Sequence, residues 1–276
     1  MVRGAGPLLR TAHIEPSLAV TLAATALALG AGLRWRAALV ALAVGAGQLS
    51  IGWSNDWLDH DRDTAVGRRD KPLAQGRIDP RTVALGAALA LAVCATASFA
   101  LGRTAGAVHL IAVGAGWGYN LRAKHTWYSV VPWALAFGLL PAVVTLTEPL
   151  GRWPAGWVMA AGALLGAGAH FANAVPDLEH DRATGVAGLP HRLGRRRSLA
   201  ATLALVATGV VVVGAAATTT AVSVAILAVG ATALGSVVVA LRRGHDRAAF
   251  RGIVALLVLL AFGVVAGGTG VSVAGG

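Results

Sequence analysis

The feature that most limits the fold of this chain is a series of long apolar stretches separated by short charged ones. Each stretch has about 17–23 residues, which is enough for a helix to cross the hydrocarbon core of a bilayer. The expected ranges are 16–33, 37–54, 80–101, 104–120, 127–147, 154–176, 198–217, 219–241 and 250–270. Because an irregular segment cannot pair its backbone groups in lipid, each stretch is expected to be helical. The sequence therefore predicts an all-α, polytopic membrane bundle of about nine transmembrane helices, in one integral-membrane domain over residues 1–276.

The composition agrees with a membrane protein and excludes other classes. Charged residues make up 13% of the chain, whereas soluble domains carry about a quarter. The hydrophobic share of 56% excludes a disordered chain. The net charge of +11 would suggest nucleic acid in a soluble protein, but here no basic soluble domain is available to bind it. We therefore expect the lipid bilayer as a partner, and no nucleic acid.

Lysine and arginine are distributed unevenly between the two ends of the predicted bundle. With alternating spans, 19 of the 23 basic residues fall on the side of the N-terminus and of every second connecting segment. Cytoplasmic segments of membrane proteins carry such an excess. The sequence therefore predicts a multi-pass protein of the cell membrane whose N-terminus and charged end, with any site built there, face the cytoplasm.

Nine of the twelve acidic residues occur in two short stretches, 56–79 and 177–181, each at the charged end of a predicted span. Residues 55–63 and 173–181 both read Asn-x3-Asp-x3-Asp, with matched positions 118 residues apart. Side chains at positions i, i+4 and i+8 share one face of a helix. The pattern predicts two pseudo-symmetric, aspartate-rich helix ends that oppose each other.

Carboxylates spaced four residues apart repel each other, and a nearby membrane increases the cost of their charge. Salt bridges to loop arginines would balance a single cluster. Two matched clusters fit Mg²⁺ better, since this ion is held by one or two carboxylates together with phosphate oxygens. We predict Asp59, Asp63, Asp177 and Asp181 as its ligands. The sequence offers neither the cysteine ligands typical of zinc nor the loop of a calcium-binding hand.

Basic side chains follow the acidic stretches. Lys71 and Arg77 come after the first, Lys124 comes shortly after Tyr119, and Arg192 comes after the second. Arginine grips phosphate oxygens in a fork, and lysine acts as a point charge. Acidic clusters mixed with such residues indicate a site for a metal ion and a diphosphate.

These motifs resemble those of the UbiA superfamily of intramembrane prenyltransferases. The segment Asn55-Asp56-x2-Asp59-x3-Asp63 is similar to that family's NDxxDxxxD, and Asp177-x3-Asp181 to its second aspartate-rich motif. Lys71-Pro72-Leu73-x2-Gly76 is similar to its RPLxxG segment, with Lys in place of Arg. The resemblance covers nearly the whole chain. It departs from the common DxxxDxxxD at Asn173, which leaves one carboxylate fewer.

The resemblance implies a Mg²⁺-dependent transfer of a prenyl group from a polyprenyl diphosphate to an aromatic or other small lipophilic acceptor. The prenyl tail would lie in a lipid-open groove among the helices. The implied catalytic residues are Asp59, Asp63, Asp177, Asp181, Lys124 and Tyr119, of which the four aspartates would hold Mg²⁺. The implied diphosphate-binding residues are Asn55, Asp56, Lys71, Arg77, Asn173 and Arg192.

Two other functions use similar features. A terpene cyclase on the same fold would need the same diphosphate site but no acceptor. A transporter also suits paired repeats and membrane acids, but its site usually lies near the bilayer midplane, away from one end. The acceptor stays open among a hydroxybenzoate, a naphthoate, a homogentisate-like phenol, a tetrapyrrole and a glycerol lipid, and the prenyl chain length stays open too.

Overall fold

The fold comes from a computed structural model, which describes residues 5–147, 149 and 151–266. Its regular elements are helices, and η marks a 3-10 helix. In chain order they are α1 (Ala5–Arg10), α2 (Ile14–Gly30), α3 (Arg36–Leu58), α4 (His60–Ala65), α5 (Pro80–Ala100), α6 (Arg103–Leu121), η1 (Ala123–His125), α7 (Val131–Thr145), α8 (Gly156–Ala174), η2 (Val175–Asp177), α9 (Leu178–Ala183), α10 (Leu189–Ala215), α11 (Thr220–Arg242) and α12 (Asp246–Ala266). The prediction of an all-α fold is confirmed for this part of the chain.

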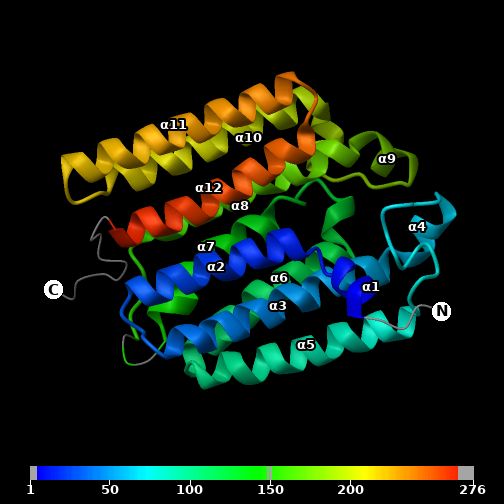
Figure 1. Cartoon of the computed structure of the whole chain (residues 1–276), viewed down its shortest axis with the longest axis horizontal. Coiled ribbons are helices and arrows are strands. Elements are labelled where there is room, and N and C mark those ends of the chain that lie inside the picture. The colour runs from blue at the N-terminus through cyan, green and yellow to red at the C-terminus, as the bar shows by residue number, and fades with distance from the viewer. Residues whose placement is uncertain (1–4, 148, 150, 267–276) are drawn as a thin grey trace.

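The long helices run side by side in alternating directions and form a closed ring (Figure 1). Each packs against the next long helix in the chain, and α12 packs back against α2. Contacts of α2 with α7 and of α8 with α12 cross the ring. The short helices α1, α4 and α9 lie together at one end of the bundle, which is called the charged end below.

Every predicted apolar stretch coincides with one long helix of the described residues, although positions 267–270 of the last stretch lie outside them. Six helical segments are long and apolar enough to cross a membrane, namely Arg36–Leu58, Pro80–Ala100, Gly156–Ala183, Leu189–Ala215, Thr220–Arg242 and Asp246–Val264. Two further apolar helices, α2 and α7, are shorter. The chain is thus a multi-pass membrane protein, and the count of nine spans stays a prediction.

Two helix starts differ from the sequence prediction. The stretch 127–147 becomes helical only at Val131, because Pro132 occupies the first turn, where its missing N–H is tolerated. The stretch 198–217 is preceded by helix from Leu189 onward, so much of the expected basic loop is helical. Gly194, with φ of +77°, bends α10 just before Arg195, so the three arginines 195–197 begin its longer, second part.

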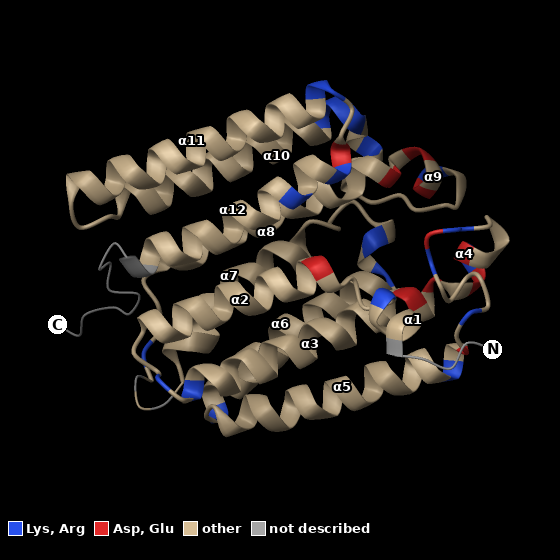
Figure 2. Cartoon of the chain, in the orientation of Figure 1, with Lys and Arg blue, Asp and Glu red and all other residues tan. Residues whose placement is uncertain are grey.

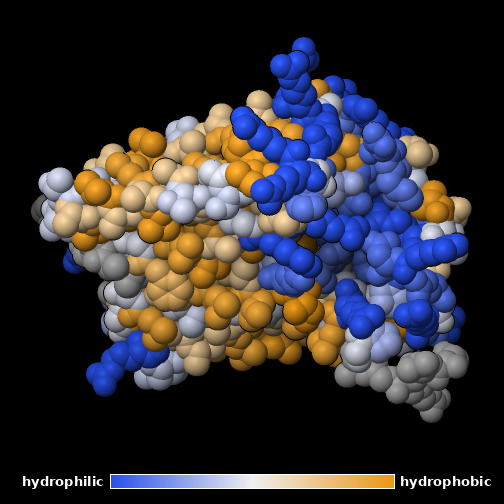
Figure 3. All heavy atoms as spheres, turned by 45° about the horizontal axis from the view of Figure 1, so that its top comes forward, coloured by the Kyte–Doolittle hydropathy of each residue, from blue (hydrophilic) through white to orange (hydrophobic). Residues whose placement is uncertain are grey.

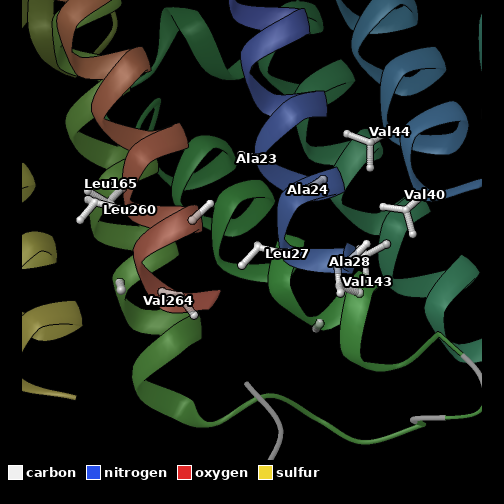
Figure 4. Close-up of a cluster of buried hydrophobic side chains, with 14 of the residues drawn as sticks. Ala23, Ala24, Leu27, Ala28, Val40, Val44, Val143, Leu165, Leu260 and Val264 are labelled. Carbon is white, nitrogen blue, oxygen red and sulfur yellow. The ribbon is translucent and has the colours of Figure 1, made fainter. Parts of the chain in front are cut away.

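The core consists mostly of alanine, valine and leucine from helices on opposite sides of the ring. Figure 4 shows part of it, with Ala28 of α2 close to Val143 of α7, and Leu165 of α8 beside Leu260 of α12. Small side chains let helix backbones approach closely where lipid provides no hydrophobic driving force between helices. Two glycines of α8 illustrate this, since a Cβ at Gly162 would lie 2.5 Å from the carbonyl oxygen of Phe137, and one at Gly166 2.7 Å from that of Trp133. This close contact fixes the position of α7 against α8.

Charge gathers at the charged end of the bundle. The acidic segments of Figure 2 lie at this end, and the opposite end shows only a few basic ones. In Figure 3 the hydrophilic surface covers the same end, and apolar surface covers most of the remaining face. The fold therefore brings the two aspartate-rich segments to one end.

Candidate active site

The first aspartate-rich segment lies where α3 ends and α4 begins. The helix is interrupted at Asp59, but the N–H of Asp63 still donates to the carbonyl oxygen of Asp59 at 2.8 Å, so the residues keep helical spacing. The side chains of Asp56, Asp59 and Asp63 are buried, with at most 6% of each residue exposed. Buried carboxylates are costly unless they are paired, so their partners decide what the segment can do.

Both lysines of the chain meet these carboxylates. The Nζ atom of Lys71 lies 3.1 Å from Oδ1 of Asp56 and 2.7 Å from Oδ2 of Asp63. Burial favours the neutral amine of Lys71, but the facing carboxylates outweigh it and raise its pKa. Lys124, in η1, donates to Oδ1 of Asp59. There burial prevails over the attraction of Asp59 and lowers the pKa of Lys124.

The second aspartate-rich segment is more open. Pro176 ends α8, because a proline cannot donate to the helix, and the chain continues as η2 and α9. The side chain of Asp177 is 37% exposed, and its nearest cation is Arg68, at 3.8 Å. Oδ2 of Asp181 lies 3.1 Å from Nε2 of His191.

A cavity of about 330 Å³, called the charged pocket below, joins the two segments. Its lining residues are Arg10, His13, Asn55, Asp56, Asp59, Arg62, Arg68, Asp70, Lys71, Pro72, Tyr119, Lys124, Asn173, Ala174, Asp177, Asp181, Val186, His191 and Arg247. Both Asn-x3-Asp pairs thus face one space, together with Lys71, Lys124 and Tyr119. Asp63, a predicted Mg²⁺ ligand, is not among the lining residues, and its contact with the pocket is the ion pair with Lys71.

Two predicted diphosphate-binding residues are not brought to the charged pocket. Arg77 is exposed in the segment between α4 and α5. Arg192 is exposed at the start of α10, and its Nε donates to the carbonyl oxygen of Ala187 at 2.9 Å. Asp61 and Glu179, which lie within the aspartate-rich segments but off the shared face, are exposed as well.

The charged pocket also contains cations that lie outside the sequence motifs. Arg62 lies 2.9 Å from Oδ2 of Asp59, and the i, i+3 spacing of the two residues was the available signal. Arg68 bridges to Asp70 at 2.8 Å and reaches toward Asp177. His13 and Arg247 come from α1–α2 and α12, and nothing in the local sequence relates them to the aspartates.

Aromatic side chains lie next to the charged pocket. The ring of Tyr119 meets Trp133 edge to face at 5.9 Å and His170 at 5.5 Å. Trp133 in turn stacks on Phe137, with ring centroids 6.1 Å apart. His170 accepts from or donates to the hydroxyl of Ser129 at 3.0 Å. Tyr119 therefore stands between a charged and an aromatic environment.

Two further cavities adjoin the charged pocket, and a third adjoins those two. The amide-lined chamber, of about 190 Å³, is lined by His13, Pro16, Ser17, Val20, Gln48, Ile51, Gly52, Asn55, Gly116, Tyr119, Asn120, Pro132, Trp133, Ala136, Phe137 and Asn173. The apolar chamber lies between α2, α7, α8 and α12. Its lining consists of aliphatic residues, glycine, proline, phenylalanine and tryptophan. The lateral opening, between α1, the start of α2 and α12, shares Asp177 with the charged pocket and Phe250 with the apolar chamber.

One protein-family model matches most of the chain. Residues 17–263 match the family described as "UbiA prenyltransferase family". Among curated proteins, the protoheme IX farnesyltransferases of two Halobacterium salinarum strains are 35% identical over 158 residues, which is 52% of this chain. The matched region spans only about a third of those relatives' length, 34% and 33%.

Solved structures resemble the fold over nearly its whole length. A UbiA homologue of Archaeoglobus fulgidus, bound to GPP and Mg²⁺, has a TM-score of 0.71 at 22% identity and covers 95% of this chain and all of its own. A UbiA homologue of Aeropyrum pernix has a TM-score of 0.70 at 20% identity, with 90% and 97% covered. A digeranylgeranylglyceryl phosphate synthase has a TM-score of 0.63 at 18% identity, with 95% and 98% covered. At these identities the likeness shows the fold alone.

Proposed function

Because this chain belongs to the UbiA prenyltransferase family, we propose that it transfers a prenyl group from a polyprenyl diphosphate to an aromatic or other small lipophilic acceptor, releasing diphosphate in a Mg²⁺-dependent reaction. The observation that carries the proposal is the charged pocket itself. Both aspartate-rich segments and both lysines meet there. The amide-lined chamber and the lateral opening share lining residues with this pocket, and both also share lining residues with the apolar chamber. A prenyl diphosphate has the same division into a highly charged head and an apolar tail.

The donor set of the charged pocket fits Mg²⁺. Carboxylate and amide oxygens face the space from two sides, and hard cations prefer oxygen ligands. Within the described residues, no three His, Cys, Asp or Glu side chains converge closely enough to hold a metal alone. Asp59 and Asp63 on one side and Asp177 and Asp181 on the other would therefore hold Mg²⁺ together with diphosphate oxygens. Bound there, Mg²⁺ would neutralise the charge of the leaving group.

The chain's own cations have a matching role. Lys71, Lys124 and Arg62 are already directed at the carboxylates around the pocket. When a diphosphate binds, its oxygens compete for the same ammonium and guanidinium groups. These groups then stabilise the negative charge that develops as the bond between the prenyl C1 and the diphosphate oxygen breaks.

Tyr119 and Trp133 support the second half of the reaction. Cleavage leaves an allylic cation on the prenyl group, and the diphosphate keeps the bonding electron pair. Aromatic faces stabilise cations and exclude water, and the Tyr119–Trp133 pair borders the pocket where the cation would form. An electron pair of the acceptor then forms the new bond to C1, and the acceptor loses a proton to solvent at the open end.

The apolar chamber suits the prenyl tail. Its wall is made of apolar and aromatic side chains from four helices, among them Leu27, Phe137 and Leu257. The lateral opening connects the apolar chamber with the charged pocket along α12. A donor can therefore place its diphosphate in the charged pocket and its tail in the apolar chamber, and leave the amide-lined chamber empty. We place the charged pocket on the cytoplasmic side, because most basic residues gather at that end.

The test is turnover by the purified full-length protein with Mg²⁺ and geranyl, farnesyl or geranylgeranyl diphosphate, first without and then with a pool of acceptors. We expect diphosphate release that depends on an acceptor and falls at least about 100-fold in Asp59→Ala and in Asp177→Ala. The matched controls are Asp61→Ala and Glu179→Ala, which remove exposed carboxylates from the same segments. These two should keep the parent activity.

Three outcomes would contradict the proposal. Equal activity of Asp59→Ala, Asp177→Ala and the parent would exclude the charged pocket as the reaction site. Full activity in the presence of a chelator would exclude the Mg²⁺ dependence. A cyclic hydrocarbon or alcohol formed from the donor alone, and lost in both pocket variants, would identify a terpene cyclase.

A further inference from the structure

The amide-lined chamber collects an unusual share of the chain's amide side chains. The sequence has three asparagines and two glutamines. All three asparagines, Asn55, Asn120 and Asn173, and one glutamine, Gln48, line this chamber. The charged pocket accounts for Asn55 and Asn173, which it shares, but not for Gln48, which lies deeper.

Gln48 has no hydrogen-bond partner for its side chain within the part of the chain that the structure describes. It lies near the middle of α3, a helix long and apolar enough to span a membrane. Asn120, by contrast, donates to the carbonyl oxygen of Ile51 at 2.9 Å and to Oγ of Ser54 at 2.8 Å. An amide left without partners in an apolar environment costs free energy, so a partner from outside the chain would stabilise the site.

The chamber contains no fixed charge. Among its lining residues there is no lysine, arginine, aspartate or glutamate. Its one ionisable base is His13, which lies at the mouth and contacts Asp56 at 3.2 Å. A carboxylate bound in the depth of this chamber would be an unpaired charge inside the membrane region, which is strongly unfavourable.

The position and size of the chamber limit what it holds. Gln48, Ile51 and Asn55 follow the helical repeat along one face of α3, so Gln48 lies two turns, about 10 Å, below Asn55. The cavity of about 190 Å³ is smaller than the 300–1,000 Å³ pockets of drug-sized ligands. A compact ring system fits these dimensions.

We propose that the amide-lined chamber binds the acceptor, that this acceptor is a compact aromatic molecule whose buried polar group is uncharged, and that Gln48 selects it by hydrogen bonding. The inference rests on the proposed prenyl transfer. Gln48 can both donate and accept, so it suits a hydroxyl, carbonyl or amide group. The nucleophilic atom of the acceptor then faces the mouth beside Tyr119, and the polar group lies deeper.

The experiment uses pairs of acceptors that differ in charge. The probes are 4-hydroxybenzamide against 4-hydroxybenzoate, and 1,4-dihydroxynaphthalene against 1,4-dihydroxy-2-naphthoate. Their binding to the full-length protein is measured by calorimetry with Mg²⁺ and inorganic diphosphate present. Transfer is measured with farnesyl diphosphate as donor. We expect the neutral member of each pair to bind about tenfold more tightly, or more, and to give the higher kcat/KM.

The variant Gln48→Met keeps the length of the side chain and removes its hydrogen bonds. We expect about a 5- to 10-fold weaker affinity for the neutral probes and an unchanged KM for the donor. The control Thr96→Val removes an exposed hydroxyl from α5 whose only partner is the carbonyl of Ala92. It should change neither constant.

The inference would be overturned if the carboxylate probes bound as well as the neutral ones, or if Gln48→Met bound every probe like the parent. It would also be overturned if the donor bound and neither probe pair did. If the proposed function itself were wrong, farnesyl diphosphate would be neither bound nor converted. The donor measurements therefore distinguish that failure from a failure of the acceptor inference.

Discussion

The two aspartate-rich segments have the same spacing and different surroundings. In the first, Asp56, Asp59 and Asp63 are buried and each contacts a lysine. In the second, Asp177 is partly exposed and, among the residues that the structure describes, its one cationic partner is Arg68, at 3.8 Å, while Asp181 meets a histidine. One half of the charged pocket is therefore balanced by the chain's own cations, and the other half is left for a ligand.

The two segments differ in the pairing of their carboxylates because the basic side chains that follow them have different partners. After the first segment, Lys71 turns back toward the carboxylates. After the second, the guanidinium of Arg182 donates to the carbonyl oxygen of His191, and that of Arg192 to Ala187. These arginines hold the backbone between α9 and α10, so they are not available to Asp177. A repeated spacing thus fixes where carboxylates lie but not how their charge is balanced.

Lys71→Met should give the largest effect. It leaves Asp56 and Asp63 buried without their shared cation, and losing one partner of a buried pair costs about 3–5 kcal/mol of unfolding free energy. Thermal unfolding of the protein in detergent would measure it. Asp177→Asn, in the open half, should change stability by less than about 0.5 kcal/mol. If Lys71→Met and Asp177→Asn lowered the free energy of unfolding equally, the first segment would not depend on its lysine more than the second depends on its aspartate.

Asp177→Asn should instead act on the reaction. We expect kcat to fall by about 100-fold or more, since a carboxylate that serves the bound metal and diphosphate is lost while the fold is kept. Steady-state kinetics and the unfolding curve are measured on the same preparation. Glu179→Gln, the exposed neighbour, is the control. A variant that lost activity only in proportion to its stability would contradict this division of roles.

Ligand binding should stabilise the protein through the open half. With Mg²⁺ and inorganic diphosphate at about ten times their Kd, the unfolding free energy should rise by about 1.4 kcal/mol. Mg²⁺ alone should do less, because the lysines already pair with the first segment's carboxylates. A chelator should abolish the gain, and Asp177→Asn should not show it. A full gain from Mg²⁺ without diphosphate would show that the site needs no phosphate oxygens.

His191→Gln should have the smallest effect. His191 contacts Asp181 at 3.1 Å and fixes its carboxylate, so we expect the KM of the donor to rise about three- to fivefold, and kcat to change little. His180→Gln, on α9, provides the control. If His191→Gln lowered kcat/KM more than Asp177→Asn does, His191 would do more than orient the carboxylate of Asp181.

Much of the fold and part of the site follow from the sequence. The apolar stretches predict the long helices, because length and hydropathy are local properties. One pocket is lined by the predicted site residues Asp59, Lys71, Tyr119, Lys124, Asp177 and Asp181, whereas Asp63 is not among its lining residues. The division of the pocket into a balanced and an open half depends on how loops fold back, and no local pattern encodes that.

The misplaced and missed residues have physical reasons. Arg77 follows Gly76, which has a φ of +66°, in a turn closed by the N–H of Arg77 and the carbonyl oxygen of Pro72, and its side chain is exposed there. Arg192 lies on a helix whose start the apolar pattern placed too late. Arg68, His13 and Arg247 reach the pocket from separate segments, so only tertiary packing brings them to the aspartates.

The placement of the lysines also makes this protein unusually simple to probe chemically. Apart from the α-amino group, Lys71 and Lys124 are the only primary amines among 276 residues, and each is covered by a carboxylate. An amine-reactive reagent therefore has almost nowhere else to act. Mass spectrometry of the parent protein after treatment would give the extent of acylation at each lysine. A low extent would mean that the carboxylates of the first aspartate-rich segment keep the lysine bound and protected.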